Sequence, residues 1–344
     1  MARKAAPGRN TTIVDVAAKA GVSAMTVSRV INGQPGVGPD TRATVNDAIR
    51  ELGYRPNQTA RNLVTSTELR IGVVYSNPSA AFMSDFLTGV FEEASARGAR
   101  LILVKGEGGR APPLEAIEAL GTSGVSGVIL TPPLSESPTV LRVLRDAGVP
   151  IASVGAHQVA GAICVRIDDR QGAYEMTRDL IALGHRNLGF VVGNPDQAAS
   201  AERLAGFHAA VRESDGIHTT VAQGDFSYAS GLVAGEQLLD AAQPPTAIFA
   251  SNDDMAAAIV SVAHRRQLDV PGELTVVGFD DTTVAVTLWP PLTTVHQPVR
   301  QLAAEALGLL VTEIAAPARP SDRIDRVLPH RIVRRQSTAV PRRD

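Results

Sequence analysis

The sequence has a single cysteine and no long hydrophobic run, and both features limit what the protein can be. Cys164 has no partner for an internal disulfide and no CxxC neighbour for a metal site, so we expect a buried thiol. No apolar run approaches the roughly 18 residues that a membrane-spanning helix needs. The basic first segment, residues 1–12, has no apolar stretch after it. A cytoplasmic protein that does not contact a membrane is therefore expected.

Signals of catalysis are also missing. The seven histidines form no HxxxH or HxH pair, which argues against a metal site. The run Gly106–Gly109 lacks the lysine of a phosphate-binding loop and the spacing of a dinucleotide loop, and no GxSxG motif places a nucleophile. Adjacent acids such as Asp280 and Asp281 point apart in a strand and make poor acid–base pairs. The sequence predicts a binding protein with no catalytic residues, no metal and no cofactor.

Charge is distributed unevenly along the 344 residues. The net charge is −2 overall, but residues 1–67 carry nine Lys or Arg against four acids, and the remainder carries 24 against 31. A polyanion would be attracted to the first segment and repelled by the second. Charge alone leaves open a solvated basic surface with no partner.

The first segment predicts two short helices joined by a tight turn. The first helix spans Ile13–Ala20, Gly21 reverses the chain and Ser23 is a suitable N-cap for the second helix. One side of the second helix is apolar and carries Val27, Val30 and Ile31. The other side carries Ala24, Met25, Ser28 and Arg29. This pattern is typical of a helix-turn-helix, whose second helix reads base edges in the major groove.

A third helix is predicted from Pro39 to about Leu52, because proline suits the first helical position and apolar residues recur at helical spacing. These apolar residues, which would cover the first two helices, are Ala43, Val45, Ala48, Ile49 and Leu52. Gly53 and Tyr54 end the helix, and Arg55 before Pro56 makes an extended step.

Residues 15–33, DVAAKAGVSAMTVSRVING, and 51–65, ELGYRPNQTARNLVT, resemble the DNA-binding headpiece of the lactose-repressor (LacI/GalR) family of bacterial transcription factors. The resemblance implies base contacts from Ala24, Met25 and Arg29. Ala24 and Met25 would read shape and thymine methyl groups, and Arg29 would donate to guanine. Residues expected to contact the DNA backbone or support the headpiece are Thr12, Ser23, Thr26, Ser28, Asn32 and Tyr54.

The resemblance also implies a hinge helix that becomes ordered on DNA. Its minor-groove residues would be Asn57, Ala60 and Leu63, with Leu63 as an apolar wedge at the centre of the site. An isolated helix of this length is marginal in water, so folding on binding is expected. The partner would be a pseudo-palindromic double-stranded operator bound by a homodimer.

From Arg70 onward, short apolar runs alternate with amphipathic stretches. The runs are RIGVVY, RLILVK, SGVIL, VPIASVG, LGFVVG, TAIFAS and ELTVVGFD. This alternation predicts doubly wound parallel sheets in two lobes, with a boundary near residues 165–173 and a new helix at Asp169 or Gln171. The expected architecture is an all-α helix-turn-helix headpiece, a hinge helix and an α/β core that resembles periplasmic binding proteins.

The expected domains follow from that architecture. The headpiece is residues 1–56, and the hinge helix with its linker is 57–67. The N-terminal lobe is 68–167 plus about 297–327, and the C-terminal lobe is 168–296 plus about 328–340. No leucine heptads occur near the end of the chain, so we expect a dimer rather than a coiled-coil tetramer, with a disordered basic tail.

The resemblance implies a small-molecule effector between the lobes, where the carboxyl ends of the strands meet. A sugar presents hydroxyls in fixed directions and an apolar face, so its site requires planar polar groups and an aromatic ring. The effector-binding candidates are Phe82, Arg203, Phe226, Asn252, Asp280 and Gln297.

Structural alternatives exist for these candidates. Arg203 can pair with Glu202 or Asp196 on a helix surface, Asp280 can cap a turn and Phe226 can belong to the core.

In the first lobe, Ser79, Phe82 and Met83 are alternative ligand contacts, because the segment after Asn77 exceeds the family's usual spacing. Gly155 stands where some sugar binders carry an aspartate, so that contact is not expected.

Two functions follow from the sequence. The first is a DNA-binding regulator, a repressor of carbohydrate-utilisation genes whose ligand either releases DNA or promotes binding. The second is a sugar-binding or sugar-processing protein with a non-functional headpiece.

Overall fold

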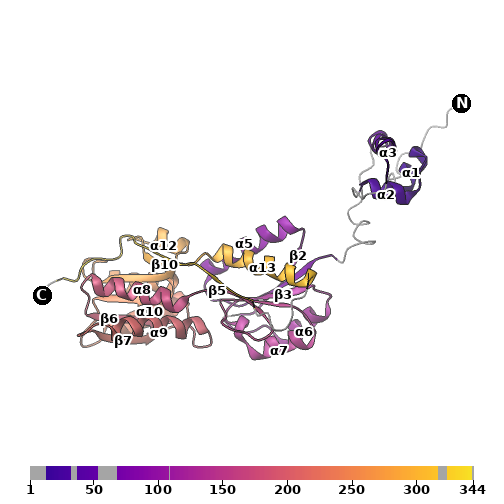
Figure 1. Cartoon of the computed structure of the whole chain (residues 1–344). Coiled ribbons are helices and arrows are strands. Elements are labelled where there is room, and N and C mark those ends of the chain that lie inside the picture. Colours follow the sequence, from indigo (N-terminus) through magenta and orange to yellow (C-terminus); the bar gives the residue numbers. More distant parts are fainter. Residues whose placement is uncertain (1–12, 32–36, 53–67, 108, 317–323, 343–344) are drawn as a thin grey trace. The chain divides into compact units, whose positions relative to one another are not determined.

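The computed structural model describes residues 13–31, 37–52, 68–107, 109–316 and 324–342. The chain forms two units, Met1–Glu68 and Leu69–Asp344. Figure 1 shows the small helical unit and the α/β unit. The predicted hinge residues, 57–67, lie outside the described residues.

The first unit contains the three predicted helices, which are confirmed as α1 (Ile13–Ala20), α2 (Ala24–Ile31) and α3 (Pro39–Glu51). Their buried side chains form one apolar cluster of Val16, Ala17, Val27, Val30, Val45 and Ala48. The predicted cap is also confirmed, because the backbone N–H of Thr26 donates to Ser23 Oγ at 3.1 Å. Gly21 has φ +66 in the turn between α1 and α2, a conformation that favours glycine.

The second unit contains two sheets with the same strand order. The first sheet runs β11-β5-β4-β3-β1-β2 and the second runs β12-β10-β9-β8-β6-β7. The first sheet consists of β1 (Arg70–Tyr75), β2 (Arg100–Lys105), β3 (Gly127–Leu130), β4 (Ile151–Val154), β5 (Ile163–Ile167) and β11 (Asp325–Leu328). The second consists of β6 (Asn187–Val192), β7 (His218–Gln223), β8 (Ala247–Ala250), β9 (Thr275–Asp280), β10 (Thr293–His296) and β12 (Arg331–Val333). Every pairing is parallel except that of β12 with β10, which agrees with the predicted fold class.

Helices cover both faces of each sheet (Figure 1). In the first lobe they are α5 (Ala80–Arg97), α6 (Leu114–Thr122), the short 3-10 helix η1 (Leu134–Glu136), α7 (Pro138–Asp146) and α13 (Val299–Ala315). In the second lobe they are α8 (Asp169–Ala182), α9 (Ala198–Arg212), α10 (Tyr228–Leu239), α11 (Asp253–Arg265) and α12 (Thr283–Thr287). No described helix is long and apolar enough to cross a membrane.

The chain passes between the lobes three times. It leaves the first sheet after β5 and enters α8, returns from β10 to α13, and crosses again between β11 and β12. The first crossing lies at residues 168–169, where α8 begins at Asp169, one of the two predicted positions. Because all three connections are short, the lobes can change their relative orientation only by bending at these segments.

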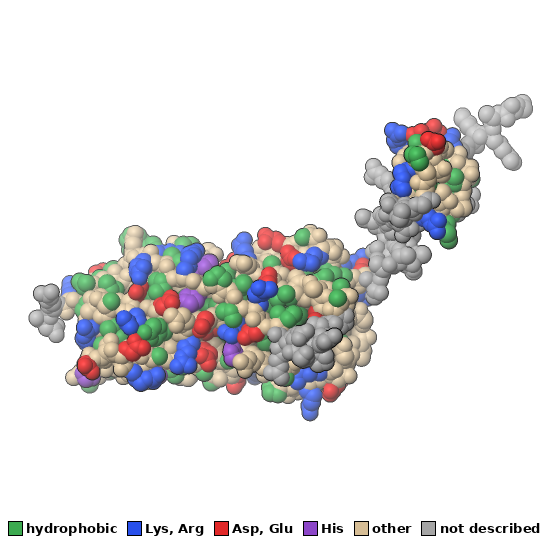
Figure 2. All heavy atoms as spheres, in the orientation of Figure 1, with side chains coloured by type: hydrophobic (Ala, Val, Ile, Leu, Met, Phe, Trp, Pro, Cys, Tyr) green, Lys and Arg blue, Asp and Glu red, His purple; other side chains and the backbone are tan. Residues whose placement is uncertain are grey.

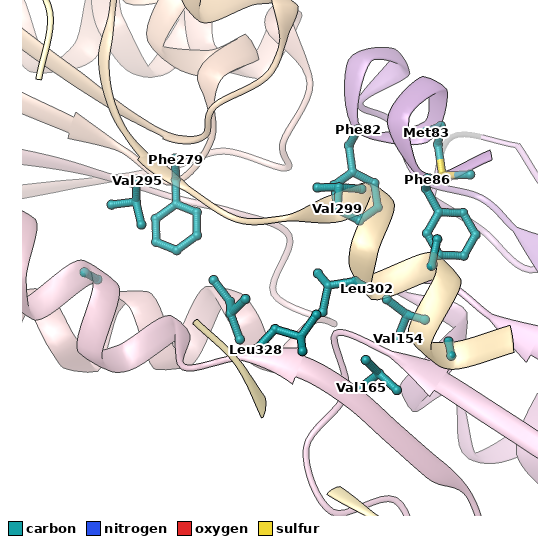
Figure 3. Packing of buried hydrophobic residues seen from close by; sticks show 14 of the residues in the cluster. Phe82, Met83, Phe86, Val154, Val165, Phe279, Val295, Val299, Leu302 and Leu328 are labelled. Carbon is teal, nitrogen blue, oxygen red and sulfur yellow. The ribbon is translucent and has the colours of Figure 1, made fainter. Parts of the chain in front are cut away.

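One apolar cluster extends through both lobes. On α5 it includes Phe82 and Phe86, and on β9 and β10 it includes Phe279 and Val295 (Figure 3). Val299 and Leu302 of α13 lie between these groups in the same view. The inter-lobe region is therefore packed with side chains from both lobes.

The basic tail departs from expectation, because it is ordered through residue 342. Ser337 is fully buried and its hydroxyl donates to the carbonyl of Val276 at 2.6 Å. The carbonyl of Ala339 accepts from Thr275 Oγ1 at 3.2 Å and lies 2.9 Å from His185 Nε2. The prediction of a disordered tail is wrong, because these backbone groups continue the hydrogen bonding of the second lobe.

Candidate ligand pocket and DNA-reading helix

A pocket of about 510 Å³ of empty space, its open mouth included, lies between the two lobes of the α/β unit. Its walls come mostly from loops and helix starts that follow the carboxyl ends of strands, the usual ligand position in open α/β sheets. All six predicted effector-binding residues line it, namely Phe82, Arg203, Phe226, Asn252, Asp280 and Gln297. The structure thus brings together residues separated by up to 215 positions in the sequence.

Arg203 of α9 is the central cation of this pocket and is only 5% exposed. Its Nε donates to Asp169 Oδ1 at 2.8 Å, and its Nη1 donates to the carbonyl of Ser251. Nη1 also lies 3.7 Å from Asp280 Oδ1. The alternative that Arg203 pairs on the surface with Glu202 or Asp196 is therefore wrong, because the guanidinium is buried between carboxylates of the second lobe.

Asp280 ends β9 with φ +115, and Asp281 follows with φ +62. Residues other than glycine rarely adopt positive φ, and such strain concentrates at functional sites. Burial raises the pKa of Asp280 well above its usual value, whereas the neighbouring Arg203 charge lowers it. Gln297, in the second crossing, donates from Nε2 to Asp280 Oδ1 at 2.5 Å. Asp280 is thus held by residues from two separate segments.

Phe226 lies in the loop between β7 and α10, with φ +74. Its ring lies over Gly193, where an added Cβ would come within 2.0 Å of Phe226 Cζ. Asn252 fixes the same loop, because its Nδ2 donates to the carbonyl of Phe226 at 2.8 Å. Asn252 Oδ1 accepts from the N–H of Met255 and caps α11. Each end of the Asn252 amide therefore has one partner within the second lobe, and the position of Asn252 supports Phe226.

The first lobe contributes Asn77, Ser79 and Phe82 to the pocket, whereas Met83 is absent from the lining. Asn77 Oδ1 accepts from the N–H of Ser79 at 2.8 Å, and Ser79 Oγ accepts from the N–H of Phe82 at 3.2 Å. These bonds form the start of α5 and direct Phe82 toward the pocket. The ring of Phe82 stacks on Phe86 with centroids 6.4 Å apart.

Sequence reasoning missed three polar residues of the pocket, Arg166, Asp169 and Gln197. Arg166 binds Asp325 through two nitrogens at 3.0 and 2.9 Å. Gln197 is 4% exposed and its Nε2 has no hydrogen-bond partner among the described residues. A signal for Asp169 existed, since it begins the helix after a strand. Gln197 is one polar residue among several in a loop and had no distinguishing signal.

Another buried acid, Asp253, lies beside the pocket in the first turn of α11. It accepts from Thr294 Oγ1 at 2.6 Å and from the N–H of Thr282 at 2.8 Å. Burial raises the pKa of Asp253 to about 7 despite these hydrogen bonds. This carboxyl connects the start of α11 to the segments after β9 and on β10.

In the helical unit, α2 presents two of the three predicted base-reading residues to solvent. Met25 is 67% exposed and Arg29 is also exposed, whereas Ala24 is half-buried against the helical core. Thr26 Oγ1 lies 2.9 Å from Ser23 Oγ at the start of the helix. The remaining headpiece and hinge candidates, Thr12, Asn32, Tyr54, Asn57, Ala60 and Leu63, lie outside the described residues, as does the side chain of Ser28.

On the face that Figure 2 shows, the α/β unit has no continuous basic patch. Acidic and basic side chains are interspersed there. The excess of positive charge therefore belongs to the first 67 residues of the sequence.

Comparison with known proteins identifies both parts. Residues 12–57 match the model of "Bacterial regulatory proteins, lacI family", and residues 177–338 match that of "Periplasmic binding protein-like domain". Catabolite control protein A of Priestia megaterium is 35% identical over 336 residues, which cover 96% of this chain and 99% of that protein.

Two solved structures are similar over almost the whole chain. The complex of the transcriptional regulator CelR with cellobiose has a TM-score of 0.71 at 33% identity and covers 95% of this chain and 99% of that one. The lac repressor dimer bound to operator and the anti-inducer ONPF has a TM-score of 0.79 at 29% identity, covering 96% and 100%. These similarities extend across the helix-turn-helix and both lobes, and the chain belongs to the LacI family of bacterial transcriptional regulators.

Proposed function

We propose that this regulator represses carbohydrate-utilisation genes and that a sugar bound between its two lobes controls its affinity for operator DNA. The observation that carries the proposal is the grouping of Arg203, Asp280 and Gln297 around one pocket beside the ring of Phe226. Planar donors and acceptors suit the fixed hydroxyl directions of a sugar, and the ring offers an apolar stacking face. The complex of the similar CelR with cellobiose supports this ligand class.

On the DNA side, we assign base contacts to Ala24, Met25 and Arg29, with Arg29 as the donor to guanine. Met25 and Arg29 are exposed on α2, as this role requires. Leu63, with Asn57 and Ala60, would enter the minor groove from the hinge. A homodimer on a pseudo-palindromic operator is supported by the similar lac repressor dimer bound to its operator.

The mechanism is linkage between the two sites. The pocket is lined by both lobes, which are connected by short crossings, so a bound sugar changes the relative free energies of lobe orientations. Different orientations would set different separations of the headpieces in the dimer and so favour or oppose hinge folding. We expect sugar binding to lower the affinity for operator DNA and so to release it.

Regulation of transcription requires no catalysis and takes place in the compartment that contains the DNA. We therefore assign the protein to the cytoplasm as a binding protein rather than an enzyme, which the regulator role of its relatives supports. We assign DNA binding to the headpiece, 1–56, and the hinge, 57–67, and effector binding to the two lobes.

An operator-selection experiment with the full chain tests the proposal. Binding sites are selected from random duplexes, and a gel shift at moderate salt then compares the selected site with scrambled DNA while sugars are added. We expect a palindromic site, preferential binding and release by at least one sugar. Equal affinity for selected and scrambled DNA would instead favour a sugar-binding protein with an inactive headpiece.

A further inference from the structure

One hydrogen bond joins the two lobes at the start of α9. The carboxylate oxygen Oε2 of Glu136 accepts from the backbone N–H of Ala198 at 2.8 Å. Glu136 is the last residue of η1 in the first lobe, and Ala198 is the first residue of α9 in the second. We call this bond the interlobe cap. It lies outside the three crossings and joins residues 62 positions apart, so it depends on the relative orientation of the lobes.

The helix α9 differs from its neighbours in how it begins. Within the described part of the chain, Gln197 precedes the helix but makes no side-chain hydrogen bond to its start. In contrast, α8, α10 and α11 of the same lobe are each capped by the preceding residue, namely Asp168, Ser227 and Asn252. The first N–H groups of a helix have no partner within the helix. Glu136 therefore supplies from the opposite lobe the acceptor that the other three helices have locally.

Both partners of the interlobe cap belong to well-packed parts of their lobes. On the first-lobe side, Leu134 and Ser135 of η1 are buried, and Ser153 Oγ of β4 donates to the carbonyl of Ser135 at 3.2 Å. On the second-lobe side, α9 is anchored by the buried Phe207, whose ring centroid lies 4.8 Å from that of Phe190 on β6. Neither partner can follow the other lobe, so a rotation of the lobes breaks the bond.

The charge of Glu136 is not what favours the bond. Burial raises the pKa of Glu136, the N–H of Ala198 lowers it, the charge of Asp169 raises it and His157 lowers it, and the pKa stays above its usual value. Removal from water thus disfavours the charged form in this orientation. A glutamine at position 136 keeps an acceptor oxygen without the charge, whereas an alanine has neither. The oxygen that accepts from α9 is therefore the feature that must be retained.

We propose that the interlobe cap acts as a latch that holds the two lobes in the orientation of the structure before any ligand binds. Loss of the acceptor at position 136 increases the population of wider lobe orientations. A ligand that contacts both lobes then finds fewer molecules in the competent orientation, so its apparent affinity decreases. This last consequence rests on the proposed function, whereas the latch itself requires neither sugar nor DNA.

Distance measurement by electron paramagnetic resonance on the full chain tests the proposal. Spin labels are attached at Arg142→Cys on α7 and Arg212→Cys on α9, both exposed positions, in a Cys164→Ser background. Dilution with unlabelled protein leaves only distances within one chain. With Glu136 intact, one main distance is expected. Glu136→Ala should add a longer distance and change the ratio of the two orientations by about fivefold, as the net loss of one hydrogen bond would give.

The variant Ala198→Pro removes the donor of the interlobe cap. Proline suits the first position of a helix, and Gln197 has φ −118 and ψ 127, a conformation compatible with a following proline. Ala198→Pro should give the same longer distance as Glu136→Ala, and the double variant should shift the ratio no further. Glu136→Gln should retain the short distance, because its amide oxygen still accepts from Ala198.

Ser137→Ala is the matched control, because Ser137 caps α7 within the first lobe by accepting from the N–H of Val140 at 3.4 Å. This variant should leave the distance unchanged. Unchanged distances in both Glu136→Ala and Ala198→Pro would overturn the proposal, and so would an equal shift in Ser137→Ala. Additive shifts in the double variant would also overturn it, because the two residues would then act independently. No DNA or sugar is present, so these outcomes are distinct from a failure of the proposed function.

Discussion

The guanidinium carbon of Arg203 lies 3.6 Å from the centre of the Phe279 ring, within stacking distance, while Nε of the same side chain donates to Asp169. The ring provides a surface that favours a cation, and the carboxylates of Asp169 and Asp280 compensate its charge. Arg203 therefore has a fixed orientation before any ligand arrives. A preorganised donor loses less entropy on binding a sugar hydroxyl than an exposed arginine would.

Removal of Arg203 should strongly destabilise the second lobe. In Arg203→Ala the buried Asp169 and Asp280 lose their compensating cation, so we expect the free energy of unfolding at neutral pH to fall by about 3–5 kcal/mol. The loss should be smaller at acidic pH, since Arg203 no longer lowers the pKa of Asp280 and protonation removes its charge. Urea unfolding at the two pH values measures both effects.

Arg178→Ala is the matched control for that variant. Arg178 pairs with Glu213 at 2.9 Å, but both side chains are about half exposed, at 53% and 51%. An exposed pair contributes little to stability, so this variant should unfold almost as the wild type does. Equal losses from the two arginine variants would contradict a compensating role for Arg203.

Asp253 should make the stability of the protein depend on pH. Its pKa is raised from 3.8 to about 7 in the folded chain, so the folded state binds the proton more tightly than the unfolded state. The stability linked to this proton is fully present below the unfolded pKa and is lost as pH rises through the folded pKa. We expect the free energy of unfolding to decrease by up to about 4 kcal/mol between about pH 4 and pH 8.

The variant Asp253→Asn should reduce this slope, because its amide does not titrate. Some slope remains, since burial also raises the pKa of Asp280. Asp240→Asn is the control, since the side chain of Asp240 is 68% exposed in its pair with Arg266. Urea unfolding at several pH values gives the slope of the unfolding free energy against pH. An identical slope in wild type and Asp253→Asn would show that Asp253 does not cause the pH dependence.

The DNA-reading assignment separates sequence recognition from general attraction. If Arg29 donates to guanine, Arg29→Ala should weaken binding to the selected operator by about 1–3 kcal/mol and relax the base preference at one position of each half-site. Arg50→Ala removes the same charge from α3, where Arg50 is exposed and paired with Asp47. It should alter affinity for operator and scrambled DNA alike. Gel-shift titrations measure the affinities of both variants. If Arg29→Ala also weakened binding to operator and to scrambled DNA equally, base reading by Arg29 would be refuted.

The sequence was sufficient to predict the helices of the first unit and the alternating core strands, because their apolar spacing is strong. It did not indicate β5, β7, β10, β11 or β12. In β7 and β11 most residues are exposed or half-buried, and polar residues interrupt the apolar pattern. The strands β5, β10 and β12 are only three to five residues long. The positions of the predicted strand ends also indicated which residues line the pocket. The contacts of Asn252 with Phe226 and of the tail with β9 depend on long-range packing, and no local pattern encodes them.

Gly193 and Phe226 form a steric pair that should control ligand stacking. An added Cβ at position 193 would lie 2.0 Å from Phe226 Cζ, so Gly193→Ala must displace the ring. We expect a loss of about 1–3 kcal/mol in unfolding free energy and weaker sugar binding, since overpacking forces side chains away from their preferred positions. Thermal unfolding and calorimetry measure the two effects.

The double variant Gly193→Ala/Phe226→Ala identifies the cause. Without the ring, the added methyl group has space, so the double variant should be no less stable than Phe226→Ala alone. Gly235→Ala on α10 is the control for a glycine substitution, because the nearest atom to its added Cβ is 3.3 Å away, at the end of the Val262 side chain. If the losses of unfolding free energy from the two single variants add up in the double variant, Gly193 is required only for its backbone conformation. The position of the Phe226 ring then does not depend on Gly193.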